Sequence, residues 1–124
     1  MAKKSPMQRT LEVIKQDNLK YWIVEIYKTW AKRKVDLFNI IDLLVLDNGI
    51  LGIQVCGTDW APHYRKIMED EKENTLAWLA EDGTRLEVWG WRQLKKKRGG
   101  KARYWSPRIA DVSIVHGELY WEER

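Results

Sequence analysis

The first third of the chain changes from a helical to an alternating pattern of apolar residues, which predicts a helix followed by a strand. Residues 6–18 carry apolar side chains at helical spacing, so a first helix is expected there. Residues 21–30 alternate as a strand does. The charged run Lys32-Arg33-Lys34 is expected to form the turn that follows this strand.

The next apolar stretches predict two more strands joined by a tight turn. A second strand is expected at residues 36–46 and a third at residues 50–56. Between them stands Asp47-Asn48-Gly49, a strong signal for a hairpin turn. Three antiparallel strands in succession are therefore the predicted frame.

The second half of the chain predicts a long helix and then more strands. The helix is expected from about residue 59 to residue 80, with Pro62 in its first turn. A strand at residues 85–91 follows, and shorter strands are expected near 112–115 and 119–121. The whole order predicts an α/β (α+β) fold, with a mixed central sheet, an α-β-β-β-α-β core and helices packed on the sheet.

Composition limits the chain to an ordinary globular protein. Its 124 residues suit a single domain over 1–124, with 44% hydrophobic and 32% charged residues. The longest apolar run is far too short to span a bilayer, and the start lacks the apolar block of a signal peptide. We therefore expect no membrane association and a cytoplasmic location. Cys56 is the only cysteine, which excludes an internal disulfide.

Positive charge is concentrated in one segment, at about residues 92–103, which is expected to be a basic hairpin loop. The net charge is +4, and the rest of the chain carries −3 once this segment's seven positive charges are set aside. This distribution favours binding to a phosphate backbone, although a lysine-rich loop that only keeps the protein soluble has the same pattern. The residues expected to bind nucleic acid are those of this segment and of the earlier turn: Lys95, Lys96, Lys97, Arg98, Lys101, Arg103, Lys32, Arg33 and Lys34.

The chain has eight tryptophans, most of which are expected to be core or half-buried strand residues. Trp91, Tyr104 and Trp105 flank the basic segment. These three rings are candidates for stacking on bases.

Two polar residues interrupt the apolar strands, and they are the best pointers to a functional site. Asp42 lies within Ile40-Ile41-Asp42-Leu43-Leu44, and Gln54 lies between Ile53 and Val55. A buried lone carboxylate costs several kcal/mol unless it is neutralised or has partners. Asp36 has the same strand parity as Asp42, and the hairpin brings the faces of Asp42 and Gln54 together.

The order of elements, and an Asp on the second strand followed by a polar residue on the third, resemble the PD-(D/E)XK nuclease superfamily. The resemblance covers about residues 7–92 and is nearest to the small phage or bacterial and Holliday-junction-resolvase-like branch. Asp42 matches the first Asp of the family pattern, whereas Gln54 stands at the acidic position and Cys56 at the Lys position. The resemblance implies a Mg²⁺-dependent (or Mn²⁺-dependent) DNA endonuclease of the cytoplasm, or of the host cytoplasm for a phage protein.

The resemblance also implies a set of metal ligands and a catalytic lysine. The expected metal ligands are Asp42, the Gln54 side-chain carbonyl, the Val55 carbonyl and Glu12 on the first helix, with Asp36 as the alternative to Glu12. Because Cys56 cannot replace a cation, the catalytic Lys is expected from the long helix. Lys66 is the expected residue, with Arg65 and His63 as the alternatives. The expected catalytic residues are thus Asp42, Gln54 and Lys66.

Three functions remain open from the sequence. The first is a metal-dependent DNA endonuclease, acting on junctions or other branched DNA and working as a homodimer, as resolvase-like relatives do. The second is a nuclease-like DNA-binding protein without cleavage activity. The third is a tryptophan-rich protein-interaction module.

Overall fold

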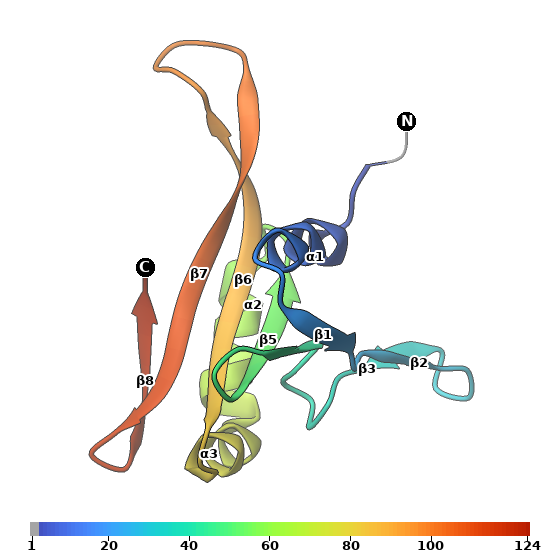
Figure 1. Cartoon of the computed structure of the whole chain (residues 1–124), viewed down its shortest axis with the longest axis vertical. Coiled ribbons are helices and arrows are strands. Elements are labelled where there is room, and N and C mark those ends of the chain that lie inside the picture. Colours follow the sequence, from blue (N-terminus) through green and yellow to red (C-terminus); the bar gives the residue numbers. More distant parts are fainter. Residues whose placement is uncertain (1–2) are drawn as a thin grey trace.

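A computed structural model describes residues 3–124 and contains a six-stranded mixed sheet with helices on both faces (Figure 1). The strand order across the sheet is β1-β4-β5-β6-β7-β8, and β2 and β3 form a separate hairpin. In chain order the elements are α1 (Pro6–Gln16), β1 (Lys20–Ile23), β2 (Ile26–Lys28), β3 (Arg33–Val35), β4 (Leu43–Leu46), β5 (Ile50–Cys56), α2 (Trp60–Arg65), a π-helical turn η1 (Lys66–Asp70), α3 (Lys72–Ala80), β6 (Thr84–Lys95), β7 (Arg103–Val115) and β8 (Glu118–Glu123).

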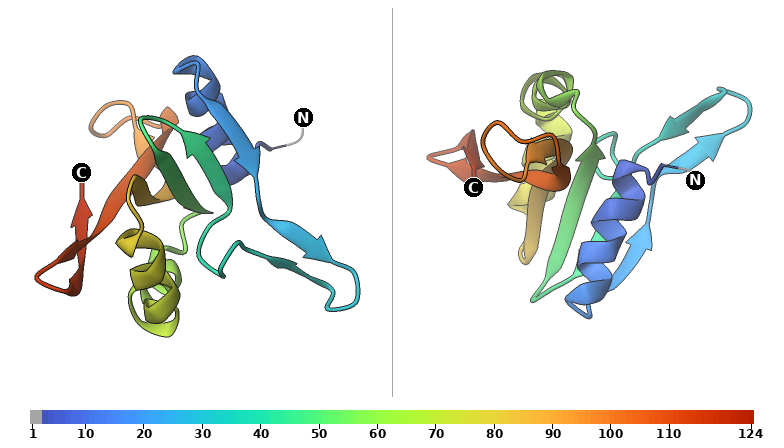
Figure 2. Two further views of the ribbon diagram at one scale, coloured as in Figure 1. Left: turned by 60° about the horizontal axis from the view of Figure 1, so that its bottom comes forward. Right: turned by 90° about the horizontal axis from the view of Figure 1, so that it is seen from above.

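Strand alternation divides the core into two layers, one on each face of the sheet. On one face α1 buries Ile14 against side chains that include Leu43 of β4 and Ile53 of β5. On the other face Ile67 packs with Leu86 and other side chains beneath α2 and α3. The helices thus lie on opposite sides of the strands (Figure 2). Gln54 shares its strand parity with the second face, so its side chain belongs to the layer of α2 and α3.

The predicted fold class is confirmed, including the order of the core elements. Helix α1 is followed by β1, β4 and β5, which pair as an antiparallel sheet. The α2–α3 connection then leads to β6, which pairs parallel to β5. Relative to the expected order, the chain inserts the β2–β3 hairpin between the first two core strands.

The strand predicted at residues 21–30 is wrong as one element, because it divides into β1 and β2. At the break, the backbone N–H groups of Val24 and Glu25 both donate to the carbonyl of Asp42, at 2.9 and 3.2 Å. Two donors on one acceptor end the regular ladder and direct the chain out of the sheet. The turn also differs from the prediction: residues 29–32 form it, and Arg33 and Lys34 lie in β3.

The strand predicted at residues 36–46 is likewise only partly correct, since regular pairing is limited to β4. The preceding residues form a loop closed by a bridge between Leu37 and Ile41. Phe38 and Asn39 adopt positive φ angles of 52° and 60° within it. Alternation along a fully apolar stretch cannot separate a strand from a buried loop of this kind.

The remaining differences concern the long helix and the C-terminal strands. The helix predicted over residues 59–80 is interrupted by the π-helical turn η1, and α3 begins after Glu71. Strand β7 is far longer than the predicted 112–115, because Pro107 within it hides the strand pattern. The basic segment is a hairpin as expected, with its ends in β6 and β7. No helix within residues 3–124 is long and apolar enough to cross a membrane.

Candidate active site

Asp42 immediately precedes β4 and is almost fully buried, with 4% of its surface exposed. Its backbone N–H donates to the carbonyl of Ile53 at 2.9 Å. Its Oδ2 accepts hydrogen bonds from the Val55 N–H at 2.8 Å and from Gln54 Nε2 at 3.0 Å. The carboxyl group is therefore fixed by the neighbouring strand β5.

Gln54 lies at the centre of the site and has a defined orientation. Its Nε2 shares two hydrogens among three acceptors, Asp42 Oδ2, the Ile40 carbonyl at 3.1 Å and Asp36 Oδ2 at 3.3 Å. Its Oε1 accepts from Lys66 Nζ at 3.2 Å and lies 3.1 Å from His63 Nδ1. Since every partner of the nitrogen is an acceptor, the reverse orientation of the amide is excluded. The Gln54 oxygen thus faces the basic side of the site, and its role as a metal ligand stays a prediction.

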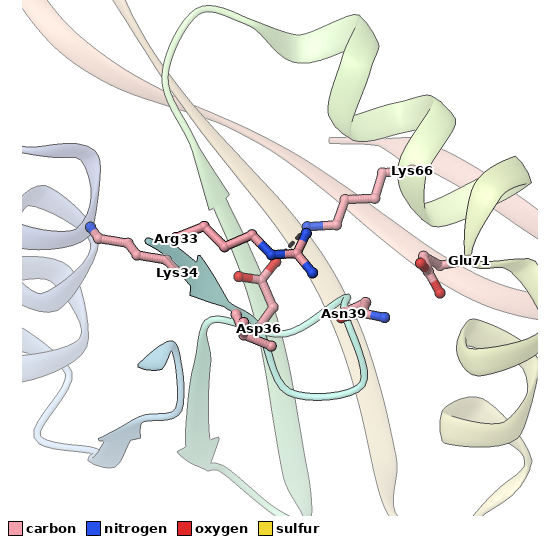
Figure 3. A pocket seen from close by; sticks show the side chains of 7 residues that line it. Arg33, Lys34, Asp36, Asn39, Lys66 and Glu71 are labelled. Carbon is pink, nitrogen blue, oxygen red and sulfur yellow. Dashed lines mark hydrogen bonds and ion pairs between the residues drawn. The ribbon is translucent and has the colours of Figure 1, made fainter. Parts of the chain in front are cut away.

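Lys66 and Asp36 form the mouth of the site. Lys66, the first residue of η1, places Nζ 2.5 Å from Asp36 Oδ2. Figure 3 shows this pair at the edge of a pocket of about 390 Å³, which Arg33, Lys34, Asn39 and Glu71 also line. The sequence predicted a lysine from the long helix at this position, and the structure brings it there.

The two aspartates carry opposite pKa shifts. Burial, reinforced by the adjacent Asp36 carboxyl, raises the pKa of Asp42 from 3.8 to about 8. Burial also acts to raise the pKa of Asp36, but hydrogen bonds with Asp42 and Lys66 outweigh it, so this pKa is lowered overall. Without a cation, two adjacent buried carboxylates cannot both ionise at low cost. The pair therefore carries one negative charge at neutral pH, balanced by Lys66.

Glu25 is a third carboxylate that the sequence did not predict as part of the site. One oxygen from each of Glu25, Asp36 and Asp42 lies within 4.8 Å of the other two. A single continuous strand over residues 21–30, as predicted, gives no reason to place Glu25 beside Asp42. The signal that was available is the one that singled out Asp42, namely an acidic residue within the apolar run Ile23-Val24-Glu25-Ile26.

The chemistry of this carboxylate cluster, defined as Glu25, Asp36 and Asp42, fits a hard divalent cation. Mg²⁺ and Mn²⁺ prefer oxygen ligands, and three carboxylates are here held at close range in a partly buried site. A cation would also offset the burial and the repulsion from Asp36 that together raise the pKa of Asp42. The residues present therefore fit the metal that the family resemblance implies, and the metal itself stays a prediction.

A second group, Cys56, Asp59 and His63, is better explained as a support for Gln54. His63 Nε2 lies 3.2 Å from Asp59 Oδ2, while Nδ1 faces Gln54 Oε1. Both partners are acceptors, so the imidazole donates to both only with a proton on each nitrogen. Burial raises the pKa of the Cys56 thiol to about 12, which disfavours a thiolate ligand.

Other predicted site residues lie elsewhere. Glu12 is on α1, which covers the opposite face of the sheet, and it pairs with Lys4 at 2.5 Å. The structure brings Asp36 and Glu25 to Asp42, and it does not bring Glu12 there. Val55 contributes its N–H to Asp42. Its carbonyl as a ligand stays a prediction.

The predicted nucleic-acid-binding residues lie on two hairpins. The hairpin between β6 and β7 extends past the sheet and carries the larger basic segment (Figure 1). Lys32, Arg33 and Lys34 lie on the β2–β3 hairpin, which leaves the body in a different direction (Figure 2). The expectation for Trp91 was wrong, because this ring is 5% exposed and donates to Thr10 in the core. Tyr104 and Trp105 are exposed to 45% and 38%.

In comparisons with known proteins, no protein-family model, curated protein or solved structure matches this chain. The function is therefore argued from the site itself.

Proposed function

We propose that the protein is a metal-dependent DNA endonuclease of the PD-(D/E)XK type that hydrolyses phosphodiester bonds in branched DNA. The observation that carries the proposal is the partly buried carboxylate cluster, in which Gln54 bridges the two aspartates and Lys66 faces them at an open pocket. Buried acidic groups with strongly shifted pKa values, beside a cation in a pocket, are typical of catalytic sites.

The arrangement of elements supports this assignment. Asp42 immediately precedes the second core strand, β4, and Gln54 lies on the third, β5, as the family pattern requires of its acidic positions. The lysine comes from the helix after the third strand instead of from the strand itself. Fold alone does not define activity, so the support comes from the polar residues found at these positions.

Asp42, Asp36 and Glu25 would hold Mg²⁺ or Mn²⁺. The metal, when bound, supplies an activated water and neutralises charge on the scissile phosphate. Lys66 offers its ammonium group to a phosphate oxygen at the pocket, which Arg33 also lines. Gln54 holds Lys66 in place, and the His63–Asp59 pair holds Gln54. Symmetric cutting of two strands needs two such sites, so we expect a homodimer on a junction.

A second candidate, a DNA-binding protein that has lost cleavage, is favoured by one observation. Lys66 already neutralises Asp36, and the amide nitrogen of Gln54 already serves both aspartates. The site is therefore satisfied without a metal. The two candidates differ in whether a divalent ion displaces these internal partners.

The test is cleavage of supercoiled plasmid and four-way-junction DNA with Mg²⁺ or Mn²⁺, compared with EDTA. We expect wild-type cleavage, and a loss of at least about 100-fold in Asp42→Asn and Lys66→Met, because each removes charge stabilisation at the reacting phosphate. Glu73→Gln, on the solvent-exposed side of α3, is the matched carboxylate control and should cleave as wild type does.

Two results would contradict the proposal. Cleavage that persists in Asp42→Asn would point to a contaminating nuclease. Salt-dependent binding by the wild type without any cleavage would favour the second candidate. Glu12→Gln distinguishes the ligand set with Glu12 from the set with Glu25 and Asp36. A loss of cleavage in this variant would show that Glu12 is needed at the metal.

A further inference from the structure

The β2–β3 hairpin, residues 26–35, projects from the body and has an exposed aromatic tip; we call it the aromatic arm (Figures 1 and 2). Trp30 lies in its turn and is 83% exposed, the highest value among the large hydrophobic side chains that are exposed. Tyr27 and Ile26, on β2, are 58% and 55% exposed. Three large apolar side chains left in water on one small hairpin indicate a contact surface.

The turn that presents Trp30 is ordered by backbone hydrogen bonds. The N–H of Lys32 donates to the Thr29 carbonyl at 3.3 Å, and the N–H of Ala31 donates to the Lys28 carbonyl at 3.1 Å. Lys32 has a φ of 51°, a left-handed conformation that favours Gly or Asn. A cation thus occupies a backbone position that suits it poorly, two residues after Trp30 in the same turn.

The charge of the arm complements a polyanion. Residues 26–35 contain Lys28, Lys32, Arg33 and Lys34 and no acidic residue. Lys34 lies 4.0 Å from Glu25, at the base of the arm, and is itself largely exposed. Exposed aromatic rings between cations are the usual features of surfaces that bind single-stranded nucleic acid.

Both ends of the arm join the carboxylate cluster directly. Glu25 immediately precedes β2, and Asp36 immediately follows β3. Arg33, Lys34 and Val35 line the pocket that holds the Asp36–Lys66 pair, as Figure 3 shows for the labelled residues. From Trp30 to Asp36 the chain has six residues, which span at most about 20 Å when extended. One strand of B-form DNA rises about 3.4 Å per nucleotide, so this length corresponds to about six nucleotides at most.

We infer that the aromatic arm binds unpaired nucleic-acid bases by stacking on Trp30, while its cations contact the adjoining phosphates. The inference rests on the proposed function and deepens it by naming the substrate class, DNA with an unpaired segment beside the cleaved phosphate. A protruding indole finds a free base face at a flap, fork or open junction, whereas bases within a duplex stack on each other. Tryptophan with lysine also suits an anionic membrane surface, but the acidic cluster at the base of the arm opposes that partner.

The test measures binding in EDTA, with the full chain and labelled DNA, so that cleavage plays no part. A fork with a single-stranded flap is compared with a blunt duplex of equal length, and 2-aminopurine in the flap reports stacking. Trp30→Ala should weaken fork binding about 10-fold and abolish the 2-aminopurine quenching, with less than a twofold effect on the duplex. Trp30→Phe should retain most of the fork preference.

Trp22→Ala is the matched control, because Trp22 is 75% exposed but lies on β1, outside the arm. It should bind both substrates as wild type does. An equal loss on fork and duplex in Trp30→Ala, or no loss on either, would overturn the inference. Binding to phosphatidylserine vesicles would also overturn it, if Trp30→Ala abolishes that binding and Trp22→Ala does not. A wild type that never cleaves but shows the Trp30 effect would overturn only the proposed endonuclease activity.

Discussion

At the scale of single residues, the site is held together by a division of charge between two aspartates. Asp36 keeps its negative charge through Lys66, and Asp42 keeps a proton because burial and Asp36 raise its pKa to about 8. Gln54 donates to both carboxyl groups, so each is satisfied in the absence of metal. This arrangement costs stability as pH rises, because the folded protein must keep the Asp42 proton that the unfolded chain releases.

Asp42→Asn tests this cost through the pH dependence of unfolding. The pKa of Asp42 is about 8 in the folded protein and ordinarily 3.8. Between these values the folded protein binds a proton that the unfolded chain has released, so this group lowers the free energy of unfolding as pH rises. In EDTA at pH 8 we expect Asp42→Asn to be more stable than wild type by several kcal/mol, with about 5 kcal/mol as the upper limit that the two pKa values set, and the difference to vanish near pH 4.

The measurement is urea unfolding of both proteins from pH 4 to pH 8. The asparagine keeps the acceptor for the Val55 N–H, so the comparison isolates the charge. Glu73→Gln, at an exposed position, should show no such pH-dependent difference. A wild type whose stability relative to Asp42→Asn rises with pH would refute the assignment of the proton to Asp42.

At the scale of elements, sequence patterns predicted the strands that pair locally and missed what tertiary contacts impose. The turn Asp47-Asn48-Gly49 and the strand at residues 50–56 were predicted correctly, because turn chemistry and apolar character agree there. The proximity of Asp36 to Asp42 was argued from strand parity, yet a loop closed by the Leu37–Ile41 bridge produces it. Residues between them adopt left-handed conformations that no periodicity reveals.

In the candidate site too, local sequence patterns predicted some residues and missed one that tertiary contacts bring in. Asp42 and Gln54 were singled out because a polar group in an apolar strand is visible in one dimension, whereas Lys66 was expected only because the family resemblance implies a lysine from the following helix. Glu25 was not, because its role depends on the chain leaving the sheet where two N–H groups share the Asp42 carbonyl. A break of this kind is a property of the neighbouring strand, so local alternation gives no sign of it.

The interruption of the long helix at η1 is an element-scale feature with its own test. Thr75 is fully buried, and its hydroxyl donates to the carbonyls of Ile67 at 2.8 Å and Glu71 at 3.0 Å. Ile67 lies in the π-helical turn that begins with Lys66, so this hydroxyl links α3 to the turn.

Thr75→Val keeps the side-chain shape but removes the side-chain donor to the buried Ile67 carbonyl. We expect a loss of about 1–2 kcal/mol in the free energy of unfolding, and weaker cleavage if the Lys66 ammonium moves. Urea unfolding measures the first effect. Thr75→Ser, which keeps the hydroxyl, is the control and should retain the cleavage activity. A valine variant as stable as wild type would show that the hydroxyl does not support the turn.

At the scale of the whole molecule, two basic hairpins extend from the body in different directions (Figure 2). The chain without the larger basic segment is acidic. The aromatic arm joins the carboxylate cluster, whereas the β6–β7 hairpin extends away from the sheet. On the proposed function, the first hairpin reads unpaired bases near the cleaved phosphate and the second binds the backbone of the adjoining duplex. The two contributions differ in their dependence on salt, because stacking is largely insensitive to it and counterion release is not.

Neutralising the tip of the β6–β7 hairpin should therefore change the salt dependence of DNA binding more than its preference for forks. Each phosphate contact contributes about 0.9 to the slope of log K against log salt on duplex DNA. Replacing Lys95, Lys96, Lys97 and Arg98 by serine should flatten that slope by about 3–4 and leave the fork preference in place. A variant with serine at Lys4, Lys15, Lys20 and Lys72 changes the net charge equally outside the two hairpins, and it should keep most of the wild-type slope. If both variants flatten the slope equally, overall charge alone drives binding, and the hairpin has no positional role.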